Sequence, residues 1–287
     1  MSVAGGVLIL FIVVIRALAI HRLPKTTFLA LWMIAALRLL LPLSIPMPFK
    51  IHIDLDVFSD VVQKLPSGNI GFPIPGESRH AYDTGAVVSS PAAERISIFV
   101  ILWLVGVLLL ALYFSISYLR SMRKFRMSVP DNTPYIREWL NAHQIVRPIE
   151  VRSSDLISSP LTYGILHPVI LLPKKLDRND QAALQYVLTH EYVHIRRFDA
   201  ITKILFAAVL CIHWFNPLVW GMYVLANRDT ELSCDAWVIR MTGVKNRSSY
   251  ALMLIKMEER RNGMSALWNH FGKNAISERI EAIMKFK

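Results

Sequence analysis

The sequence is poor in cysteine and in charge: it has two cysteines among 287 residues, and charged residues make up 18% of the chain. Two cysteines exclude the disulfide framework that stabilises small secreted domains. Cys211 and Cys234 both fall in the part of the chain that is predicted below to be cytoplasmic, so they are expected to be reduced thiols with a packing role and not a disulfide. The chain also lacks an internal repeat, which is evidence against a solenoid or an array of repeats.

A nucleic-acid-binding motif is absent as well, although the net charge is +11. The basic residues are concentrated beside apolar segments, and elsewhere they are interspersed with acidic residues. Lys and Arg beside a membrane-spanning segment are attracted to anionic lipid headgroups, which explains the excess without a nucleic acid. The expected partner of these residues is membrane lipid, and direct contact with nucleic acid is not expected.

Long hydrophobic runs are present instead. Hydrophobic residues make up 54% of the chain and the mean hydropathy is +0.40, which is too apolar for an ordinary soluble protein. Three runs, Val3–Ile20, Thr26–Leu43 and Ile96–Leu119, are each about long enough to cross a hydrocarbon core of roughly 30 Å. The sequence therefore predicts three N-terminal transmembrane helices. The first is expected to be a retained anchor, because its basic residues follow the apolar run and do not precede it.

The charges beside these runs predict the topology. Arg22 and Lys25 lie between the first two runs, and a basic cluster from Arg120 to Arg126 follows the third. Residues 44–95 are acidic on balance and rich in Pro and Gly. The positive-inside rule places this segment and the N-terminus outside the cell. The expected organisation is two helices with a short cytoplasmic turn (1–43), an extracellular loop (44–95), a third helix (96–119) and a cytoplasmic domain (120–287).

The motif HEYVH, His190 to His194, lies in a segment with the apolar pattern of a helix. Residues four apart project from the same side of a helix, so His190 and His194 can bind one metal ion. Glu191 can then reach a water on that metal, as the general base of a zinc protease does. Taken alone, the motif is also compatible with two surface histidines on an ordinary helix.

A second helical segment, Asn227–Arg240, supplies a third ligand. Glu231 is a suitable carboxylate for a catalytic zinc with one open position. Asp235, one turn on, is placed to accept a hydrogen bond from a ligand histidine. Acidic residues in a first helical turn can also serve the helix dipole alone. Cys234 is one turn from Glu231, and packing is favoured over a metal role for it.

The segment before HEYVH predicts a small mixed α and β region. A helix is expected at Asp131–His143 and a strand at Ile149–Arg152, followed by two short strands, Leu161–Ile165 and Val169–Leu172. In zinc proteases of this type an edge strand holds the substrate by main-chain pairing. That role is proposed for a set of four residues, Leu161, Thr162, Tyr163 and Gly164. The alternative is a purely structural hairpin.

Residues 200–226 form another apolar block, interrupted around Asn216 and Pro217. Proline there should break the helix into two shorter ones that dip into the membrane or pack under it. A single crossing would separate Glu231 from His190, so a hairpin is favoured. His213 and Arg228 are candidate oxyanion stabilisers, and a core histidine is the favoured reading of His213.

Four blocks together resemble a known family: HEYVHIRRFD (His190–Asp199), HWFNPLVW (His213–Trp220), ELSCD (Glu231–Asp235) and SSPLTYGILHPVILLP (Ser158–Pro173). They look like the membrane-embedded metalloproteases of the beta-lactam-sensing BlaR and MecR type. The resemblance implies a gluzincin-like α+β domain with one zinc ion. His190, His194 and Glu231 would bind that ion, Glu191 would activate water, and Asp235 and Asp199 would support the ligands.

The resemblance also implies a multi-pass protein of a bacterial cytoplasmic membrane that relays an external signal such as a cell-wall antibiotic. Such proteins cut themselves, a DNA-binding repressor, or both. The sensors of that family continue into an extracellular penicillin-binding domain, whereas this sequence ends at Lys287. We therefore expect either a longer natural chain or a separate sensor protein, and a homodimer stays open. The alternatives are a housekeeping quality-control peptidase without a sensor and a non-proteolytic, zinc-stabilised transducer.

Overall fold

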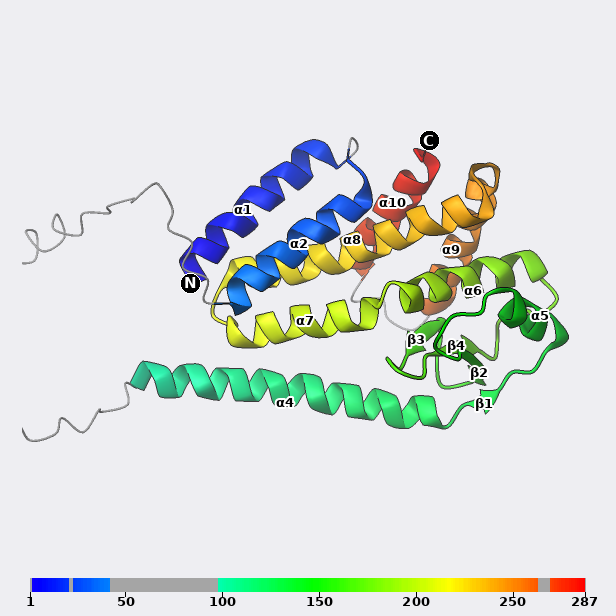
Figure 1. Cartoon of the computed structure of the whole chain (residues 1–287), viewed down its shortest axis with the longest axis horizontal. Coiled ribbons are helices and arrows are strands. Elements are labelled where there is room, and N and C mark those ends of the chain that lie inside the picture. The colour runs from blue at the N-terminus through cyan, green and yellow to red at the C-terminus, as the bar shows by residue number, and fades with distance from the viewer. Residues whose placement is uncertain (1, 21–22, 42–97, 263–268, 287) are drawn as a thin grey trace, which may run out of the picture. The chain divides into compact units, whose positions relative to one another are not determined.

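A computed structural model of the chain describes residues 2–20, 23–41, 98–262 and 269–286. The predicted outer loop, residues 44–95, lies outside the described residues. The described chain is mostly helical and contains one small sheet (Figure 1). This agrees with the predicted combination of apolar helices and an α+β region.

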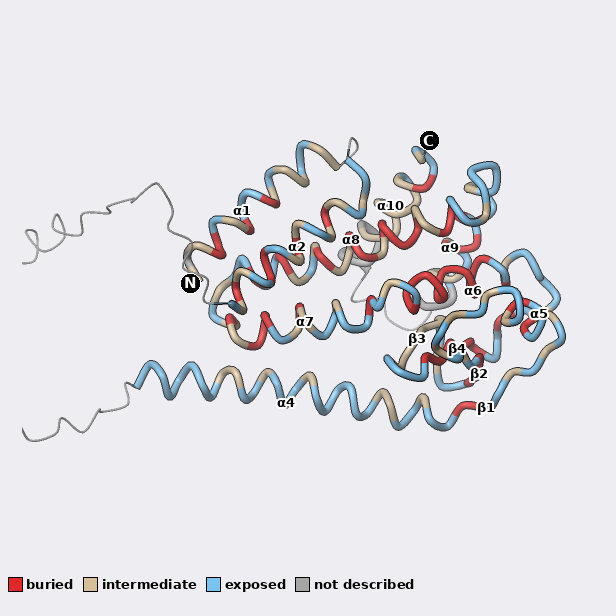
Figure 2. Tube along the Cα trace, in the orientation of Figure 1, coloured by how far each residue is buried: buried red, intermediate tan, exposed pale blue. Residues whose placement is uncertain are grey.

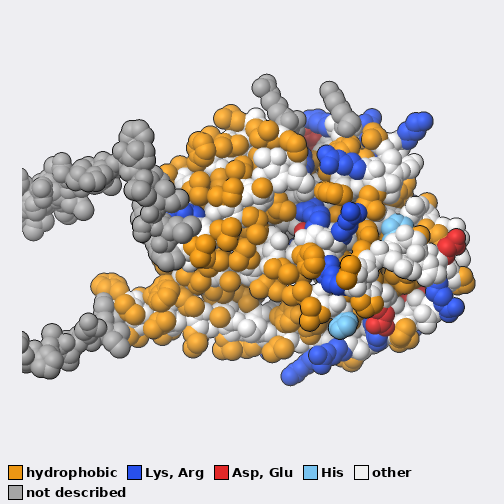
Figure 3. Space-filling view, viewed as in Figure 1, with side chains coloured by type: hydrophobic (Ala, Val, Ile, Leu, Met, Phe, Trp, Pro, Cys, Tyr) orange, Lys and Arg blue, Asp and Glu red, His pale blue; other side chains and the backbone are white. Residues whose placement is uncertain are grey.

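Three helices coincide with the predicted spans: α1 (Ser2–Ala19), α2 (Lys25–Leu40) and α4 (Ile98–Arg126). Among the described helices, α4 alone is long and apolar enough to cross a membrane, and Ala4–Ala19 of α1 forms a shorter apolar helix. No side chain of α4 is buried, and hydrophobic side chains cover much of the face that α1, α2 and α4 present in Figure 3. These surfaces suit lipid, and the number of spans stays a prediction.

Four helices, α1, α2, α7 (Asp199–Ile212) and α8 (Pro217–Thr242), share one apolar core. Its buried residues are Ile9, Ile12, Trp32, Ala35, Ala36, Leu39, Phe206, Val209, Leu210, Val219, Met222 and Ala226. The helix α4 packs against the end of α7, where Trp103 Nε1 donates a hydrogen bond to the Ile212 carbonyl oxygen at 2.8 Å. Gly106 permits this approach, because a Cβ there would lie 2.2 Å from the Trp214 ring. The apolar block of residues 200–226 therefore packs with the N-terminal helices.

The sheet has four strands in the order β1-β2-β4-β3. They are β1 (Val129–Pro130), β2 (Glu150–Ser154), β3 (Leu161–Tyr163) and β4 (Val169–Pro173). β2 and β4 are parallel, and β1 and β3 each pair antiparallel with a neighbour. β4 is buried throughout, as its run of apolar residues predicts, whereas β3 is an edge strand. The predicted helix and strands are confirmed, with the helix at α5 (Pro134–Ala142); β1 was not predicted.

The helix α6 (Gln181–Arg196) carries HEYVH and is buried along most of its length (Figure 2). Asp180 caps its N-terminus by accepting a hydrogen bond from the Ala183 N–H at 3.0 Å. The chain then turns at Phe198, which has φ 58°, and enters α7. This turn sends α7 away from the metal motif.

The predicted break at Asn216 and Pro217 is confirmed, because α7 ends at Ile212 and α8 begins at Pro217. One expectation is wrong: α8 is a single helix to Thr242, where a short helix followed by a separate one at Asn227–Arg240 was predicted. No Gly or Pro interrupts residues 222–242, and Thr230 Oγ1 donates to the Ala226 carbonyl within the helix. α8 thus continues from the apolar core back to α6 and brings the ELSCD segment beside HEYVH.

Two further helices, α9 (Arg247–Asn262) and α10 (Asn269–Met284), follow a short 3-10 turn, Val244–Asn246. The helix α10 packs against α8 and α9, and α9 also packs against α6. They complete a second apolar core with the sheet, α6 and the C-terminal half of α8. Tyr250 of α9 and Ile283 of α10 are 0% and 1% exposed in this core. The metal motif therefore lies where α6, α8, α9, α10 and the sheet meet.

Candidate metal centre

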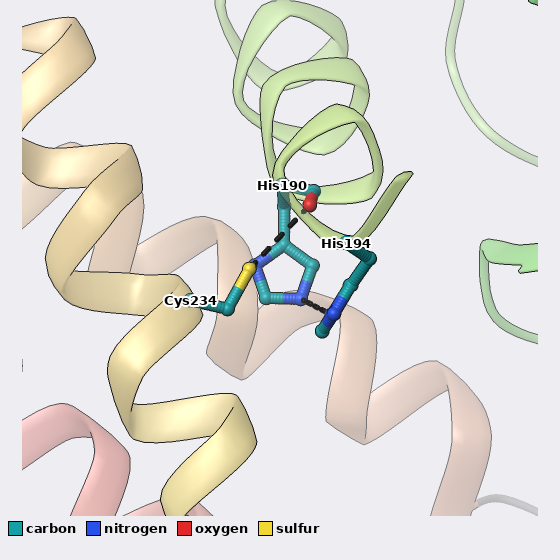
Figure 4. Close-up of side chains that lie close together, drawn as sticks. All are labelled: His190, His194 and Cys234. Carbon is teal, nitrogen blue, oxygen red and sulfur yellow. Dashed lines mark hydrogen bonds between the residues drawn. The ribbon is translucent and has the colours of Figure 1, made fainter. Parts of the chain in front are cut away.

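The two histidines of α6 face one another across a short gap. His190 Nε2 and His194 Nε2 are 3.2 Å apart, and both residues are buried. Figure 4 shows the rings meeting through one edge of His190. The helical spacing of four residues produces this pairing, because it places both side chains on the same face of α6, about one turn apart.

Glu231 reaches the same side of the two rings from α8. Its Oε2 lies 3.6 Å from His190 Nε2 and 3.8 Å from His194 Nε2. Ligands of a tetrahedral zinc with bonds of about 2.0–2.1 Å are spaced about 3.3–3.4 Å apart. The three separations of 3.2, 3.6 and 3.8 Å are close to that value, so the donor set suits one small cation.

Cys234 lies on the other edge of the His190 ring. Its Sγ is 3.5 Å from His190 Nδ1, and its thiol donates to the His190 carbonyl oxygen (Figure 4). One potential ligand atom from each of His190, His194 and Cys234 lies within 4.8 Å of the others. The described residues therefore offer two alternatives for the third ligand, which are the carboxylate of Glu231 and the sulfur of Cys234.

The remaining ring nitrogens contact acidic or hydroxyl groups. His194 Nδ1 is 2.7 Å from Asp199 Oδ2. His190 Nδ1 is 2.9 Å from Tyr250 Oη, whereas Asp235 Oδ1 is 3.5 Å away. The carboxylate of Asp235 thus reaches His190 through Tyr250, whose hydroxyl donates to Asp235 Oδ1 at 2.6 Å.

Arg279 of α10 closes this group of side chains. Its Nε and Nη2 each donate to a carboxylate oxygen of Asp235 at 2.7 Å, and its Nη1 is 3.5 Å from Glu231 Oε2. Sequence reasoning missed both Tyr250 and Arg279, which lie in α9 and α10. No motif marks them, and only the packing of α9 against α6 and of α10 against α8 brings them to the histidines.

The electrostatics of the site favour a positive charge. Burial lowers the pKa of His190, but its interactions with Cys234 and Glu231 outweigh burial and raise that pKa to about 10. Burial raises the pKa of Glu231, but His194, His190 and Lys203 lower it well below its usual range. The carboxylates of Glu231 and Asp199 thus place negative charge beside the histidine pair, as carboxylates do at cation sites.

A cavity of about 980 Å³ opens beside the histidines and Glu231. Glu191, which is buried, lines it, and so does Arg228. The edge strand forms another wall through Leu161, Thr162, Tyr163 and Gly164. The opposite apolar wall comes from α4 through Phe114, Tyr118, Met122 and Phe125. The structure therefore brings the predicted ligands, base and substrate strand to one cavity.

His213 is not brought to this cavity. It is buried after the last turn of α7, and its Nε2–H donates to the Leu39 carbonyl oxygen at 3.2 Å. The helix α7 begins at Asp199, beside His194, and a helix of this length separates its two ends by about 20 Å. His213 therefore lies far from the metal motif, in the bundle core.

Arg147 holds the edge strand beside α6. Its guanidinium donates to the carbonyl oxygens of Ile165 at 2.7 Å and Ile195 at 2.6 Å. It also lies 3.8 Å from the centroid of the Phe198 ring. Arg147 therefore links the segment after β3 to the C-terminal end of the metal-motif helix.

The sequence model of one family, described as BlaR1 peptidase M56, matches residues 1–283. The chain is 28% identical over 203 residues to the regulatory protein BlaR1 of Bacillus licheniformis, covering 67% of this chain and 33% of that protein. It is 27% identical over 155 residues to BlaR1 of Staphylococcus aureus, covering 53% and 26%. It is 23% identical over 193 residues to the methicillin resistance mecR1 protein of Staphylococcus aureus, covering 64% and 33%. The matches thus span about a quarter to a third of these relatives, and they confirm the resemblance.

Proposed function

The chain belongs to the BlaR1 peptidase M56 family, and we propose that it is a membrane-integrated zinc endopeptidase of a signal-transduction system. The observation that carries the proposal is the triangle of His190 Nε2, His194 Nε2 and Glu231 Oε2 on the wall of a large cavity. The regulatory and resistance roles in the names of the relatives support a signalling role.

We assign the zinc ligands to His190, His194 and Glu231. A ligand imidazole binds through one nitrogen and donates from the other. In both histidines Nε2 faces the shared point, while Nδ1 contacts Tyr250 or Asp199. Cys234 contacts the Nδ1 edge of His190 and is therefore the less suitable third ligand.

The chemistry then follows from the side chains around the cavity. When bound, the ion would supply Lewis-acid activation of a water molecule. Glu191 takes a proton from that water as its oxygen bonds to the scissile carbonyl carbon, and it delivers the proton to the leaving nitrogen as the C–N bond breaks. Asp199 orients His194, and Arg228 is the remaining candidate for the oxyanion.

The edge strand β3 is placed to bind an extended peptide. Among the described residues it pairs only with β4, so its other edge is available for main-chain hydrogen bonds. We propose that Leu161, Thr162, Tyr163 and Gly164 hold the substrate in this way. The substrate would be the chain itself, a cytoplasmic DNA-binding repressor, or both.

We further propose that α1, α2 and α4 span a bacterial cytoplasmic membrane, with the N-terminus outside and the catalytic domain in the cytoplasm. Supporting this, α4 exposes apolar side chains along its length and carries Arg123, Lys124 and Arg126 in its last turn. Reporter fusions after residues 20, 70 and 130 test the orientation. A cytoplasmic signal from the fusion at 70 would contradict it.

The central test is the variant Glu191→Gln in the full chain, purified in detergent. It should retain about one zinc ion per chain and lose about 10²–10⁴-fold in the rate of self-cleavage, because a general base is removed. The exposed Glu138 of α5 offers a matched control, and Glu138→Gln should cleave like the wild type. Zinc content is measured by mass spectrometry and cleavage by the appearance of a new N-terminus.

The outcomes separate the three functions. Normal cleavage by Glu191→Gln would overturn the peptidase mechanism. A wild-type chain that binds zinc but cuts neither itself nor a repressor would be a zinc-stabilised transducer. Degradation of misfolded membrane proteins without any inducing signal would indicate a quality-control peptidase.

A further inference from the structure

The two ligand histidines are supported in different ways. His194 Nδ1 meets a carboxylate directly, since Asp199 Oδ2 is 2.7 Å away. His190 Nδ1 meets a phenol, Tyr250 Oη at 2.9 Å, and the nearest carboxylate oxygen, Asp235 Oδ1, is 3.5 Å away. A separation of 3.5 Å is too long for a good N–H···O hydrogen bond, so Asp235 does not hold His190 directly.

The hydroxyl of Tyr250 lies between the two groups and can donate only one hydrogen bond. Asp235 is 1% exposed and receives two charge-assisted bonds of 2.7 Å from Arg279. It is therefore an ionised carboxylate that only accepts, and Tyr250 donates to it at 2.6 Å. The phenol oxygen is then left as an acceptor, so the proton of a neutral His190 belongs on Nδ1.

The direction of this chain of hydrogen bonds determines which nitrogen of His190 has the free lone pair. With the proton on Nδ1, the lone pair is on Nε2, which faces His194 at 3.2 Å and Glu231 at 3.6 Å. Cys234 Sγ also lies 3.5 Å from Nδ1, but its thiol donates to the His190 carbonyl oxygen and sulfur is a weak acceptor. The phenol is therefore the main partner of Nδ1.

We propose that Tyr250 is a positioning residue of the metal centre, which relays the charge of Asp235 to His190 and fixes the tautomer that binds zinc. This inference rests on the proposed function, because it takes His190 as a ligand. The relay joins three elements, α9 through Tyr250, α8 through Asp235 and α10 through Arg279. The packing of α9 and α10 thus orients His190, which is a ligand carried by α6.

The test is Tyr250→Phe in the full chain, with zinc affinity measured by competition with a chelator. The ring and its packing are kept and only the hydroxyl is lost. Removal of a group that orients a metal ligand typically weakens metal binding 10–100-fold, and that loss is expected here. The cobalt-loaded variant should also show altered visible absorption, because the His190 ring is free to turn.

Tyr186→Phe is the matched control. Its ring lies 5.8 Å from that of Tyr250 in the same core, and it loses the same hydroxyl. It should bind zinc like the wild type, and the metal-free melting temperatures of both variants show whether folding is disturbed. A second comparison uses Asp235→Asn alone and with Tyr250→Phe. If Asp235 and Tyr250 act as one unit, the double variant should bind zinc as tightly as the single variant that has the lower zinc affinity.

Each result decides one question. Equal zinc affinity in Tyr250→Phe and the wild type would overturn the relay while leaving the zinc peptidase intact. A wild-type chain that binds no zinc would instead overturn the proposed function. Equal losses in Tyr250→Phe and Tyr186→Phe would reduce the role of Tyr250 to core packing.

Discussion

The arginine inside the first apolar helix should be essential for stability. Arg16 Nε donates to both oxygens of Asp229, at 2.9 and 3.0 Å, and its Nη2 lies 2.6 Å from Glu278 Oε1. The side chain of Asp229 is 1% exposed and also accepts from Trp32 Nε1 at 2.7 Å. Arg16 of α1 thus contacts α8 and α10 directly, and Asp229 extends the network to α2 through Trp32. The perturbation is Arg16→Met, which keeps an unbranched apolar stem and removes the charged guanidinium.

The expected cost follows from the carboxylate that remains. Removing one partner of a buried ion pair costs about 3–5 kcal/mol, because the other charge is left without compensation. At about 2 °C per kcal/mol in a chain of this size, the melting temperature should fall by about 6–10 °C. Replacing both partners is often nearly neutral. Asp229→Asn keeps an acceptor for Trp32, so Arg16→Met with Asp229→Asn should recover most of the loss.

Thermal unfolding of the full chain in detergent, followed by tryptophan fluorescence, measures these differences. Arg120→Met is the matched control, since Arg120 is exposed on α4 and its replacement should change stability by less than about 0.5 kcal/mol. A shift below about 1 °C for Arg16→Met would refute the reasoning. Additive losses in the double variant would do so as well, because they would mean that the two charges do not interact.

Three further results are expected. Glu231→Gln should lower zinc affinity by at least tenfold, whereas Cys234→Ala should retain about one zinc per chain; the reverse in a metal assay would make Cys234 the third ligand. Arg147→Ala loses two hydrogen bonds near β3, each worth about 1 kcal/mol, and should raise KM for a peptide about tenfold with zinc content unchanged. Burial raises the pKa of Asp131, but hydrogen bonds from Ser153 and Thr133 and the charge of Arg178 outweigh it and lower that pKa. The ionised carboxylate therefore stabilises the fold above about pH 4, and this stabilisation is lost as the pH falls through the lowered pKa. In urea unfolding, Asp131→Asn should have a lower free energy of unfolding than the wild type at about pH 7 and a nearly equal one near pH 3.

Local patterns in the sequence were sufficient to predict most elements of this protein. The apolar runs predict α1, α2 and α4 within a few residues at the start of each helix. The proline at 217 predicts the end of one helix and the start of the next, because proline cannot continue a helix. The spacing of His190 and His194 predicts that they share one face. Each of these properties depends on residues close together in the chain.

Tertiary structure alone decided how these parts meet. The continuity of α8 brings Glu231 to within 4 Å of both histidines. The absence of Gly and Pro from residues 222–242 permits this continuity, but it does not determine that this helix packs against α6. Tyr250 and Arg279 join the site from 60 and 89 residues after His190, through packing that involves no motif. Arg16 meets Asp229 across 213 positions. Contacts at such separations depend on which apolar helix faces pack against one another. Local sequence patterns predict that a face is buried, but they do not determine which helix it packs against.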